Sequence, residues 1–504
     1  MTRTASTDDE ASGTEARTAP GTDESMILGL IGIIMSLLLL MVLAYRGVSV
    51  VLAAPICAFF AMAMSGAPLL PGYTEIFMPA LGNFVRNYFP LFATGAIFGG
   101  LMTTAGYAKA IAQILARTFG ARHALVATAL TSGLLTYGGI STYVVVFVMF
   151  PLALELFRQA DIPRRLMPAT IAVGSLTFTM TALPGSPQIQ NIIPGNAFET
   201  SAFAAPGLGL LGGAMMLFSS LAWLTYRSRQ LAKAGEHFAA PTETEKAKVT
   251  HGEAVDSHAE VTEASTHALL TPAHPGLAFI PLLVMFTVNL VCTKWVLPSM
   301  DWGFLEQEPY KGATLGNRLA VWAALVAMLA SVLTVLLLNF RKLGLLWKVM
   351  GDSVKNAFIP ILTTGSEVGY GAVIASAAAF AIIRDGILGV SGSALIASAV
   401  STSVVAGITG SASGGMTIAL NAMGEEFKRM ALEQGVSLEA MHRITAMASG
   451  GLDSMPHNGA VITLLLVCGL THRESYKDIF MVTLLIPVLT VATLIPVVMA
   501  FGSF

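Results

Sequence analysis

Apolar runs of about 20 residues recur along the whole chain, and no other feature of the sequence limits the possible folds as strongly. A helix of about 20 residues, rising about 1.5 Å per residue, crosses the hydrocarbon core of a bilayer, which is about 30 Å thick. Only 12% of the residues are charged, about half the share of a soluble domain. The sequence therefore predicts an all-α polytopic membrane protein.

The charge balance and the cysteines argue against several other kinds of protein. The net charge of −2 gives no reason to expect a nucleic-acid partner. Cys57, Cys292 and Cys468 each lie alone inside an apolar run, so we expect neither a disulfide framework nor a metal site, and no motif indicates a cofactor. Residues 1–25 are polar and acidic and lack the basic start of a signal peptide, which predicts a disordered tail.

The rest of the chain divides into two similar halves, 26–226 and 275–504. Between them, 227–274 is rich in Glu, Lys, Thr, Ala and His and has almost no large apolar residues, so we expect a cytoplasmic linker. Three landmarks of the first half recur about 270 residues later: FPLFATGAIFGG at 89–100 with IPILTTGSEVGY at 359–370, YGGIST at 137–142 with GITGSAS at 407–413, and LPGSPQIQN at 183–191 with LDSMPHNGA at 452–460. The chain is therefore predicted to be an internal duplication.

The Lys and Arg residues predict how the halves lie in the membrane. Basic residues flank 122–157 on both sides, and such residues mark the cytoplasmic face. Its apolar legs, 124–135 and 143–157, are about 18 and 22 Å long as helices, too short to cross, so we expect a re-entrant hairpin with YGGIST at its tip. Each half then has five crossings, here taken to include a single run at 91–116. Five is odd, so the second half is inverted and both termini lie outside.

One predicted crossing in each half is broken. ALPGSPQIQN interrupts the run at 165–198, and GGLDSMPHNG interrupts the run at 443–471, between Arg443 and His472. Irregular backbone at membrane depth is tolerated only inside protein or beside a wet cavity. A single Pro-Gly break is often only a kink. Paired broken helices in inverted repeats, however, are typical of secondary transporters, with the substrate at the midplane.

Three ionisable residues fall inside predicted crossings. Asp453 and His457 lie in the second broken helix, and Glu367 lies in the run at 354–383. Ionisable residues within a membrane span are candidates for ion coupling. For Glu367, a hydrogen bond to a neighbouring helix is an equally good interpretation.

Several stretches resemble the GntP family of gluconate and hydroxy-acid permeases, within the ion transporter superfamily. They are the duplicated frame with its hairpins, SGGLDSMPHNGAVITLL at 449–465 and GLTHRESYKD at 469–478. The PHNGA segment together with YGGIST is similar to the β-hydroxybutyrate permease branch. Gluconate permeases read more like PPHPGP where this chain has LPGSPQIQN, a departure that argues against gluconate. Members of the family are bacterial inner-membrane proton symporters for small organic anions.

The resemblance implies import of a short hydroxy-monocarboxylate, such as 3-hydroxybutyrate, with a proton or, alternatively, sodium. Backbone N–H groups at the Gly-rich tips would receive the carboxylate, hydroxyls would line the site, and amides would bind the substrate hydroxyl. Asp453, His457 and Glu367 are the coupling candidates. The expected substrate-binding residues are Gly138, Gly139, Ser141, Thr142, Ser186, Gln188, Asn191, Thr409, Ser411, Ser413 and Asn458.

Other functions are compatible with parts of the sequence. A gluconate or sugar-acid permease of the same family is one alternative, and a passive anion channel is another. An intramembrane serine protease is a third, because SASG at 411–414 is similar to the GxSG motif of rhomboid proteases. That motif's first Gly is missing here, and rhomboids lack the inverted duplication, so we expect no enzyme. The sequence leaves the oligomeric state open, and a homo-oligomer is compatible with it.

Overall fold

The computed structural model describes residues 23–46, 48–239, 270, 272, 274–311, 313–389 and 392–502. Within these ranges the regular structure is helical and includes no strand. The predicted tail at 1–25 and linker at 227–274 lie mostly outside the described residues. The start of the expected linker is instead helical, because the last helix of the first half continues to Lys233.

The first half of the chain is built from helices α1 to α11. A π-helical segment, Tyr73–Phe77, joins two of them into one long helix. The helices are α1 (Asp23–Tyr45), α2 (Val50–Met64), α3 (Leu69–Gly72), α4 (Met78–Thr104), α5 (Tyr107–Phe119), α6 (Ala124–Tyr137), α7 (Thr142–Gln159), α8 (Met167–Ser175), α9 (Phe178–Thr181), α10 (Ile189–Phe198) and α11 (Pro206–Lys233).

The second half repeats this order of helices. Its last two helices are joined by a π-helical segment, Phe480–Leu485. The helices are α13 (Ile280–Val291), α14 (Leu315–Leu338), α15 (Leu343–Ser376), α16 (Phe380–Gly389), α17 (Ala394–Thr409), α18 (Ala412–Glu433), α19 (Leu438–Ser449), α20 (Gly459–Val467), α21 (His472–Ile479) and α22 (Ile486–Phe501).

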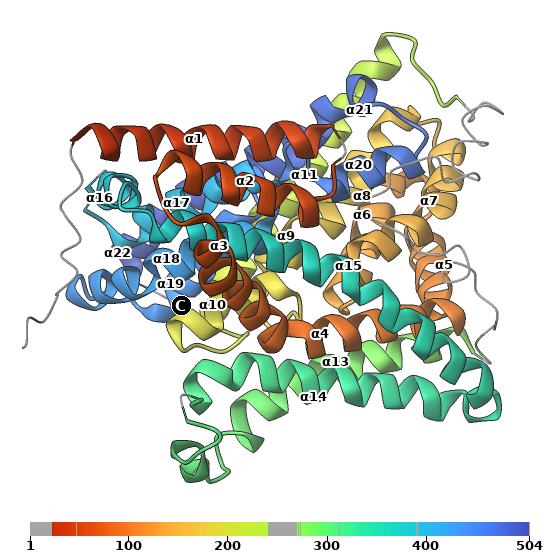
Figure 1. Ribbon diagram of the computed structural model, residues 1–504. Coiled ribbons are helices and arrows are strands. Elements are labelled where there is room, and N and C mark those ends of the chain that lie inside the picture. The colour runs from red at the N-terminus through yellow and green to blue at the C-terminus, as the bar shows by residue number, and fades with distance from the viewer. Residues whose placement is uncertain are drawn as a thin grey trace, which may run out of the picture.

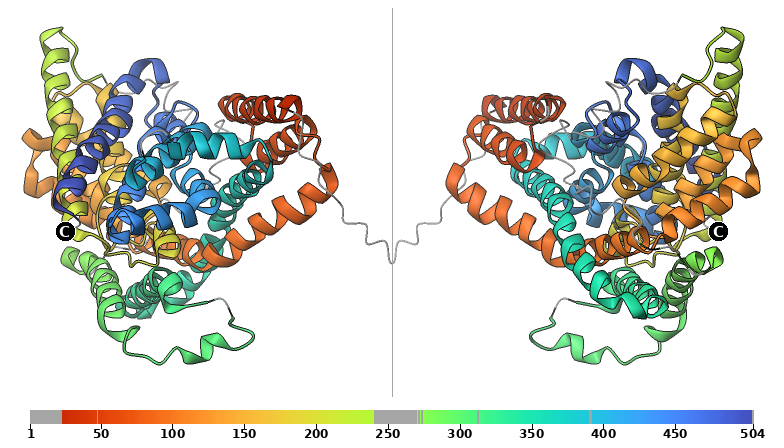
Figure 2. Two further views of the ribbon diagram at one scale, coloured as in Figure 1. Left: turned by 90° about the vertical axis from the view of Figure 1, so that its left-hand side faces the viewer. Right: turned by 90° about the vertical axis from the view of Figure 1, so that its right-hand side faces the viewer.

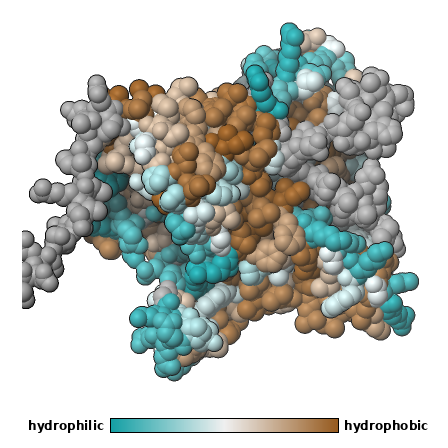
Figure 3. All heavy atoms as spheres, viewed as in Figure 1, coloured by the Kyte–Doolittle hydropathy of each residue, from teal (hydrophilic) through white to brown (hydrophobic). Residues whose placement is uncertain are grey.

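Seven helices of the described chain are long and apolar enough to cross a membrane, or eight if the bent pair α4 and α5 counts as one. Large apolar side chains such as Leu38, Leu333 and Phe218 are exposed on their outer faces, as expected where lipid replaces water. Figure 3 shows apolar side chains over much of one face of the molecule, with polar ones mainly toward its left- and right-hand ends. The prediction of an all-α polytopic membrane protein is confirmed.

The helices that correspond in the two halves, α4 and α15, pack against each other along much of their length. Glycines let them approach closely: a β-carbon on Gly369 would lie 2.9 Å from the carbonyl oxygen of Phe77, and one on Gly365 would lie 3.3 Å from Leu81. Small residues at helix contacts are the usual means of close packing in membranes. Figure 2 shows α1–α2 (red) and α13–α14 (green) apart from each other at the periphery, with the hairpins and broken helices gathered together.

The predicted hairpins are present in both halves. Helices α6 and α7 pair across residues 138–141, and α17 and α18 pair across Gly410 and Ser411. In Figure 1, α5, α6 and α7 lie toward the right of the molecule, whereas α16, α17 and α18 lie toward the left. The two hairpins therefore enter from opposite sides, as an inverted duplication requires.

Two details of the sequence-based interpretation were wrong. The run at 91–116 is not one continuous helix: α4 begins at Met78 and ends at Thr104, and the chain bends by 64° into α5. The bend occurs at Gly106, which has a φ of +73°, a backbone conformation that glycine adopts without strain. The short helices α5 and α16, which lead into the hairpins, were not predicted as separate elements. A signal was present for α5, since Lys109, Gln113 and Arg117 recur every four residues on one face.

Candidate functional site

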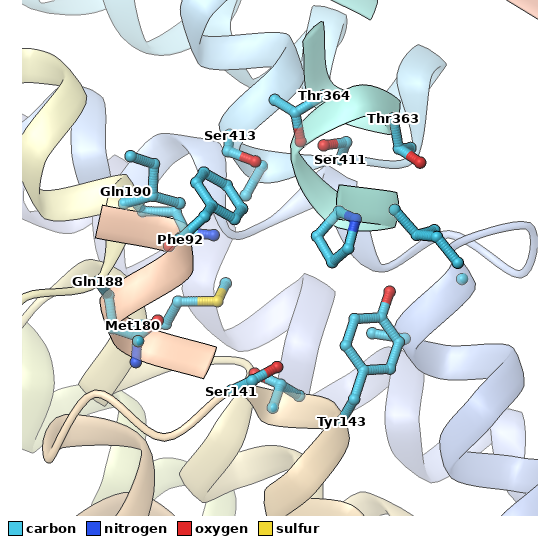
Figure 4. Close-up of a pocket in the computed structure, with 18 of the residues that line it drawn as sticks. Phe92, Ser141, Tyr143, Met180, Gln188, Gln190, Thr363, Thr364, Ser411 and Ser413 are labelled. Atoms are coloured by element: carbon cyan, nitrogen blue, oxygen red, sulfur yellow. The ribbon is translucent and has the colours of Figure 1, made fainter. Parts of the chain in front are cut away.

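A cavity of about 270 Å³ lies where the two hairpin tips meet the two broken helices. Figure 4 shows Ser141 and Tyr143 on one side of it and Ser411, Ser413, Thr363 and Thr364 on the other. Most of the residues predicted to form the site line this cavity: Gly139, Ser141, Thr142, Gln188, Glu367, Thr409, Ser411, Ser413, Asp453, His457 and Asn458.

Four helices begin at the wall of this cavity. They are α7, α10, α18 and α20, and in each case the first residues of the helix line the cavity. The first N–H groups of a helix lack partners within the helix, and the helix dipole places about half a positive charge there. No Lys or Arg is found among the described residues that line the cavity. An anion in this cavity would therefore be held by helix N-termini and hydroxyl groups rather than by a basic side chain.

In the first half, the hairpin tip turns at Gly139, which has a φ of +82°. Ser141 is the N-cap of α7, but its side chain makes no capping hydrogen bond, so its hydroxyl is available to the cavity. The hydroxyl of Thr142, in contrast, donates to the carbonyl oxygen of Ser175 at 3.0 Å. Gln188, the N-cap of α10, donates from Nε2 to the carbonyl oxygen of Thr136 at 2.6 Å.

In the second half, the tip turns at Gly410, with a φ of +66°. Ser411 caps α18 by accepting a hydrogen bond from the N–H of Gly414 at 3.1 Å. Asn458 caps α20 by accepting from the N–H of Val461 at 2.9 Å, and its Nδ2 donates to the carbonyl oxygen of Gly410 at 2.9 Å. The amide of Asn458 therefore holds the broken helix against the hairpin tip.

Asp453 lies in the break between α19 and α20 and is 2% exposed. Its Oδ1 accepts a hydrogen bond from the hydroxyl of Ser454 at 3.1 Å, and no ion pair to it is found among the described residues. The neighbouring helix α21 fixes this break, because Tyr476 donates to the carbonyl oxygen of Ser454 at 3.0 Å. A buried carboxylate without a cationic partner is costly, and a proton or a bound cation relieves that cost.

His457 stands beside the second hairpin tip. A β-carbon on Gly410 would lie 2.9 Å from its Nε2, and that nitrogen is buried with no hydrogen-bond partner among the described residues. The ring also contacts the backbone of Gly407 and Ile408. Because Gly410 has no side chain, the imidazole of His457 can lie at the cavity wall.

Glu367 is contributed by α15, outside both hairpins and both broken helices. Its side chain is 2% exposed, and Oε2 has no hydrogen-bond partner within the described structure. This oxygen lies directly against Gly414, close to the hydroxyl of Ser411. If Glu367 only formed a hydrogen bond to a neighbouring helix, the position of its unpaired Oε2 at the cavity wall would have no explanation. No group of three or more His, Cys, Asp and Glu side chains in the described part of the chain could hold a metal ion.

Three residues predicted to bind substrate do not line the cavity: Gly138, Ser186 and Asn191. Asn191 is fully buried, donates to the carbonyl oxygens of Ser186 and Ala202, and accepts from Arg443 Nη1 at 2.8 Å. Gly138 packs against Leu282. Asn191 thus forms part of the contact between the two halves of the chain.

Arg443 is the centre of that contact. The residue lies inside α19 rather than at the start of a crossing, and it is fully buried. It donates to the carbonyl oxygens of Ala202 and Ala204, with a distance of 2.8 Å for the shortest bond to Ala204. The hydrogen-bond donors of the Arg443 guanidinium are therefore paired with carbonyl and amide oxygens, not with a carboxylate.

Further cavity residues were not predicted from the sequence. They include Tyr143, Gln190, Thr363 and Thr364. Thr363 and Thr364 lie one turn before Glu367 on α15, so a search for hydroxyls three or four residues from the buried carboxylate would have found them. Tyr143 directly follows the hairpin tip and had no such signal.

Comparisons with known proteins agree with this architecture. The chain is 40% identical over 462 residues to the "Uncharacterized transporter YxjC" of Bacillus subtilis (strain 168). The aligned region covers 90% of this chain and 96% of that protein. Its fold is similar to the crystal structure of the Alcanivorax borkumensis YdaH transporter, with a TM-score of 0.52 and 16% identity, over 95% of this chain and 98% of the other. No family model matches the sequence.

Proposed function

Because this chain belongs to the same transporter family as YxjC, we propose that it is a secondary active transporter that imports a short hydroxy-monocarboxylate, such as 3-hydroxybutyrate, together with a proton. One observation carries the proposal: four helix N-termini converge on a cavity that also contains two buried carboxyl groups with no cationic partner among the described residues. The N-termini suit an anion. The carboxyl groups suit a proton or another cation.

The size and polarity of the cavity support a small organic anion. About 270 Å³ is enough for an acid of a few carbon atoms. The hydroxyls of Ser141, Tyr143 and Ser413 provide hydrogen bonds for a hydroxyl-bearing substrate, and Phe92 and Met180 provide apolar surface for its carbon chain. The resemblance of the PHNGA and YGGIST segments to hydroxy-acid permeases of the GntP family adds the substrate class.

The orientation is part of the proposal. Arg229 and Lys233 at the end of α11 and Arg341 and Lys342 before α15 are expected on the cytoplasmic side. In this arrangement both termini lie outside the inner membrane of a bacterial cell. The substrate cavity, which extends from the hairpin tips toward Val50 and Asn356, then faces the cytoplasm.

Transport into proteoliposomes tests the proposal. Counterflow with a panel of C3 to C6 carboxylates, including gluconate, identifies the substrate. Uptake of that acid against its gradient is then measured with a pH gradient, with a sodium gradient and with neither. We expect accumulation of a short hydroxy acid driven by the pH gradient. Accumulation driven only by a sodium gradient would identify sodium as the coupling ion. Flux only down the substrate gradient would indicate a channel.

A further inference from the structure

A second polar cavity lies next to the substrate cavity and is separate from it. Its volume is about 480 Å³. Four asparagines line it together with one tyrosine and one carboxylate: Asn83, Asn87, Tyr88, Asn196, Asn421 and Glu425.

The four helices that line the second cavity also line the first. On α4, Tyr88 lines the second cavity and Leu91 the first. On α18, Thr417 lines the second cavity and Ser413 the first. The corresponding pairs are Ile193 and Gln190 on α10, and Val368 and Glu367 on α15.

These four pairs form a thin barrier, here called the septum. The members of each pair are at most four residues apart, which corresponds to about 6 Å along a helix. All eight side chains are buried, as a closed barrier between the two cavities requires. The directions of the helices agree: α10, α15 and α18 run from the first cavity toward the second, and α4 runs the opposite way.

The second cavity has the chemistry of a passage rather than of a tight binding site. Amide side chains both donate and accept hydrogen bonds without holding a charge, and a pathway must bind its solute weakly enough to release it. Asn196 donates to the hydroxyl of Tyr88 at 2.7 Å, while its buried Oδ1 has no partner in the described structure. Arg318 donates to Asn87 Oδ1 at 3.0 Å and places a positive charge beside this cavity, which attracts anions.

We propose that the asparagine-lined cavity is the second half of the transport path and that the septum is the gate between the two halves. The proposal rests on the proposed function, since it supplies the route by which the organic anion reaches the central cavity. With α11 ending in the cytoplasm, the asparagine-lined cavity is the entrance from outside. The structure is then closed at the septum and open toward the cytoplasm.

Cysteine labelling in membrane vesicles of known sidedness tests this without any substrate. The native cysteines are buried and are replaced by alanine in the background chain. Asn83→Cys and Asn421→Cys report on the second cavity, and Asn356→Cys reports on the first. We expect a membrane-impermeant maleimide to label the first two only from outside and the third only from the cytoplasm. Labelling of all three from one face would overturn the proposal.

A second measurement tests the gate itself. Thr417→Trp fills the septum, and Leu432→Trp places the same side chain on the exposed face of the same helix. We expect T417W to lose at least 90% of uptake while its Asn356→Cys derivative still labels from the cytoplasm, and L432W to transport normally. Wild-type flux in T417W would contradict the gate. Correct labelling without transport of any carboxylate by the parent protein would instead contradict the proposed function.

Discussion

Asn458 donates a hydrogen bond of 2.9 Å to the carbonyl oxygen of Gly410, and this bond ties the second broken helix to the second hairpin tip. The first half has the same relationship: Gln188 donates to the carbonyl oxygen of Thr136. Both amides are N-caps of the half-helix that follows the break. In each half an amide therefore ties the hairpin tip to the broken helix, and in this structure the two amides support the geometry of the site.

Asn458→Asp is the sharpest test of this link. The aspartate keeps an oxygen that accepts from the N–H of Val461, but it loses the donor that bonds to the carbonyl oxygens of Gly410 and Asp453, and a carbonyl facing a carboxylate is unfavourable. Losing one such bond costs about 1 kcal/mol, and more when a buried partner stays unpaired, so we expect at least a tenfold loss of uptake. Protein yield and thermal stability should change little. Wild-type uptake by N458D would show that the link is dispensable, and Gln188→Glu is the matched variant in the first half.

Gly414→Ala should stop transport by displacing a carboxylate. A β-carbon at this position would overlap Glu367 Oε2, so the carboxyl group would have to leave its place at the cavity wall. We expect at least a tenfold lower uptake rate in G414A. Gly351→Ala is the control, because nothing lies within 4 Å of the β-carbon it would add. Normal uptake by G414A would mean that the position of Glu367 is not critical.

Arg443→Lys should destabilise the protein. Lysine cannot reproduce the forked guanidinium, so Asn191 and the carbonyl oxygens of Ala202 and Ala204 would lose donors. Each hydrogen bond between a charged donor and a buried acceptor contributes about 1.5 to 3 kcal/mol. We expect a clearly lower melting temperature in detergent and little protein in the membrane. Arg229→Lys, an exposed change near the end of α11, should melt like the wild type; an equally stable R443K would show that the network is not structural.

The sequence predicted the features that are local. Clusters of Pro, Gly and polar residues inside an apolar run mark a break, whereas single prolines such as Pro90 and Pro360 lie inside continuous helices, so the hairpin at 138–141 and the break around Asp453 were predicted correctly. Charges inside a run are equally visible, which is why Glu367 and His457 were proposed before the cavity was known.

What the sequence missed depends on contacts between distant segments. Hydropathy cannot tell a basic residue at a membrane boundary from one buried against carbonyl groups, so Arg443 was taken as the start of a crossing. Asn191 resembled a ligand-binding amide because its partner lies in the other half of the chain. The bend at Gly106 was missed because apolar residues continue on both sides of it, between the polar positions Lys109, Gln113 and Arg117 of α5.

Asp453→Asn should separate transport from coupling. The substitution removes the titratable group at nearly constant shape, and an asparagine oxygen can still accept the hydrogen bond that Asp453 Oδ1 accepts from the Ser454 hydroxyl. If Asp453 carries the coupled proton, D453N should lose at least 90% of the accumulation driven by a pH gradient and still exchange internal for external substrate. The matched control is Asp352→Asn, at an exposed carboxylate of α15 that pairs with Lys355, and it should accumulate normally.

The alternative is that Asp453 only supports the break between α19 and α20. Accumulation would then survive D453N and fail in Asp453→Ala, which removes the acceptor of the Ser454 bond. Undiminished accumulation in D453N would indicate that Glu367 or His457, rather than Asp453, carries the coupled proton. Glu367→Gln and His457→Gln separate these. Within the described structure both Glu367 Oε2 and His457 Nε2 are buried without a partner, but Glu367 is the stronger expectation, because only a carboxylate carries a negative charge that a proton must neutralise before an anion can enter beside it.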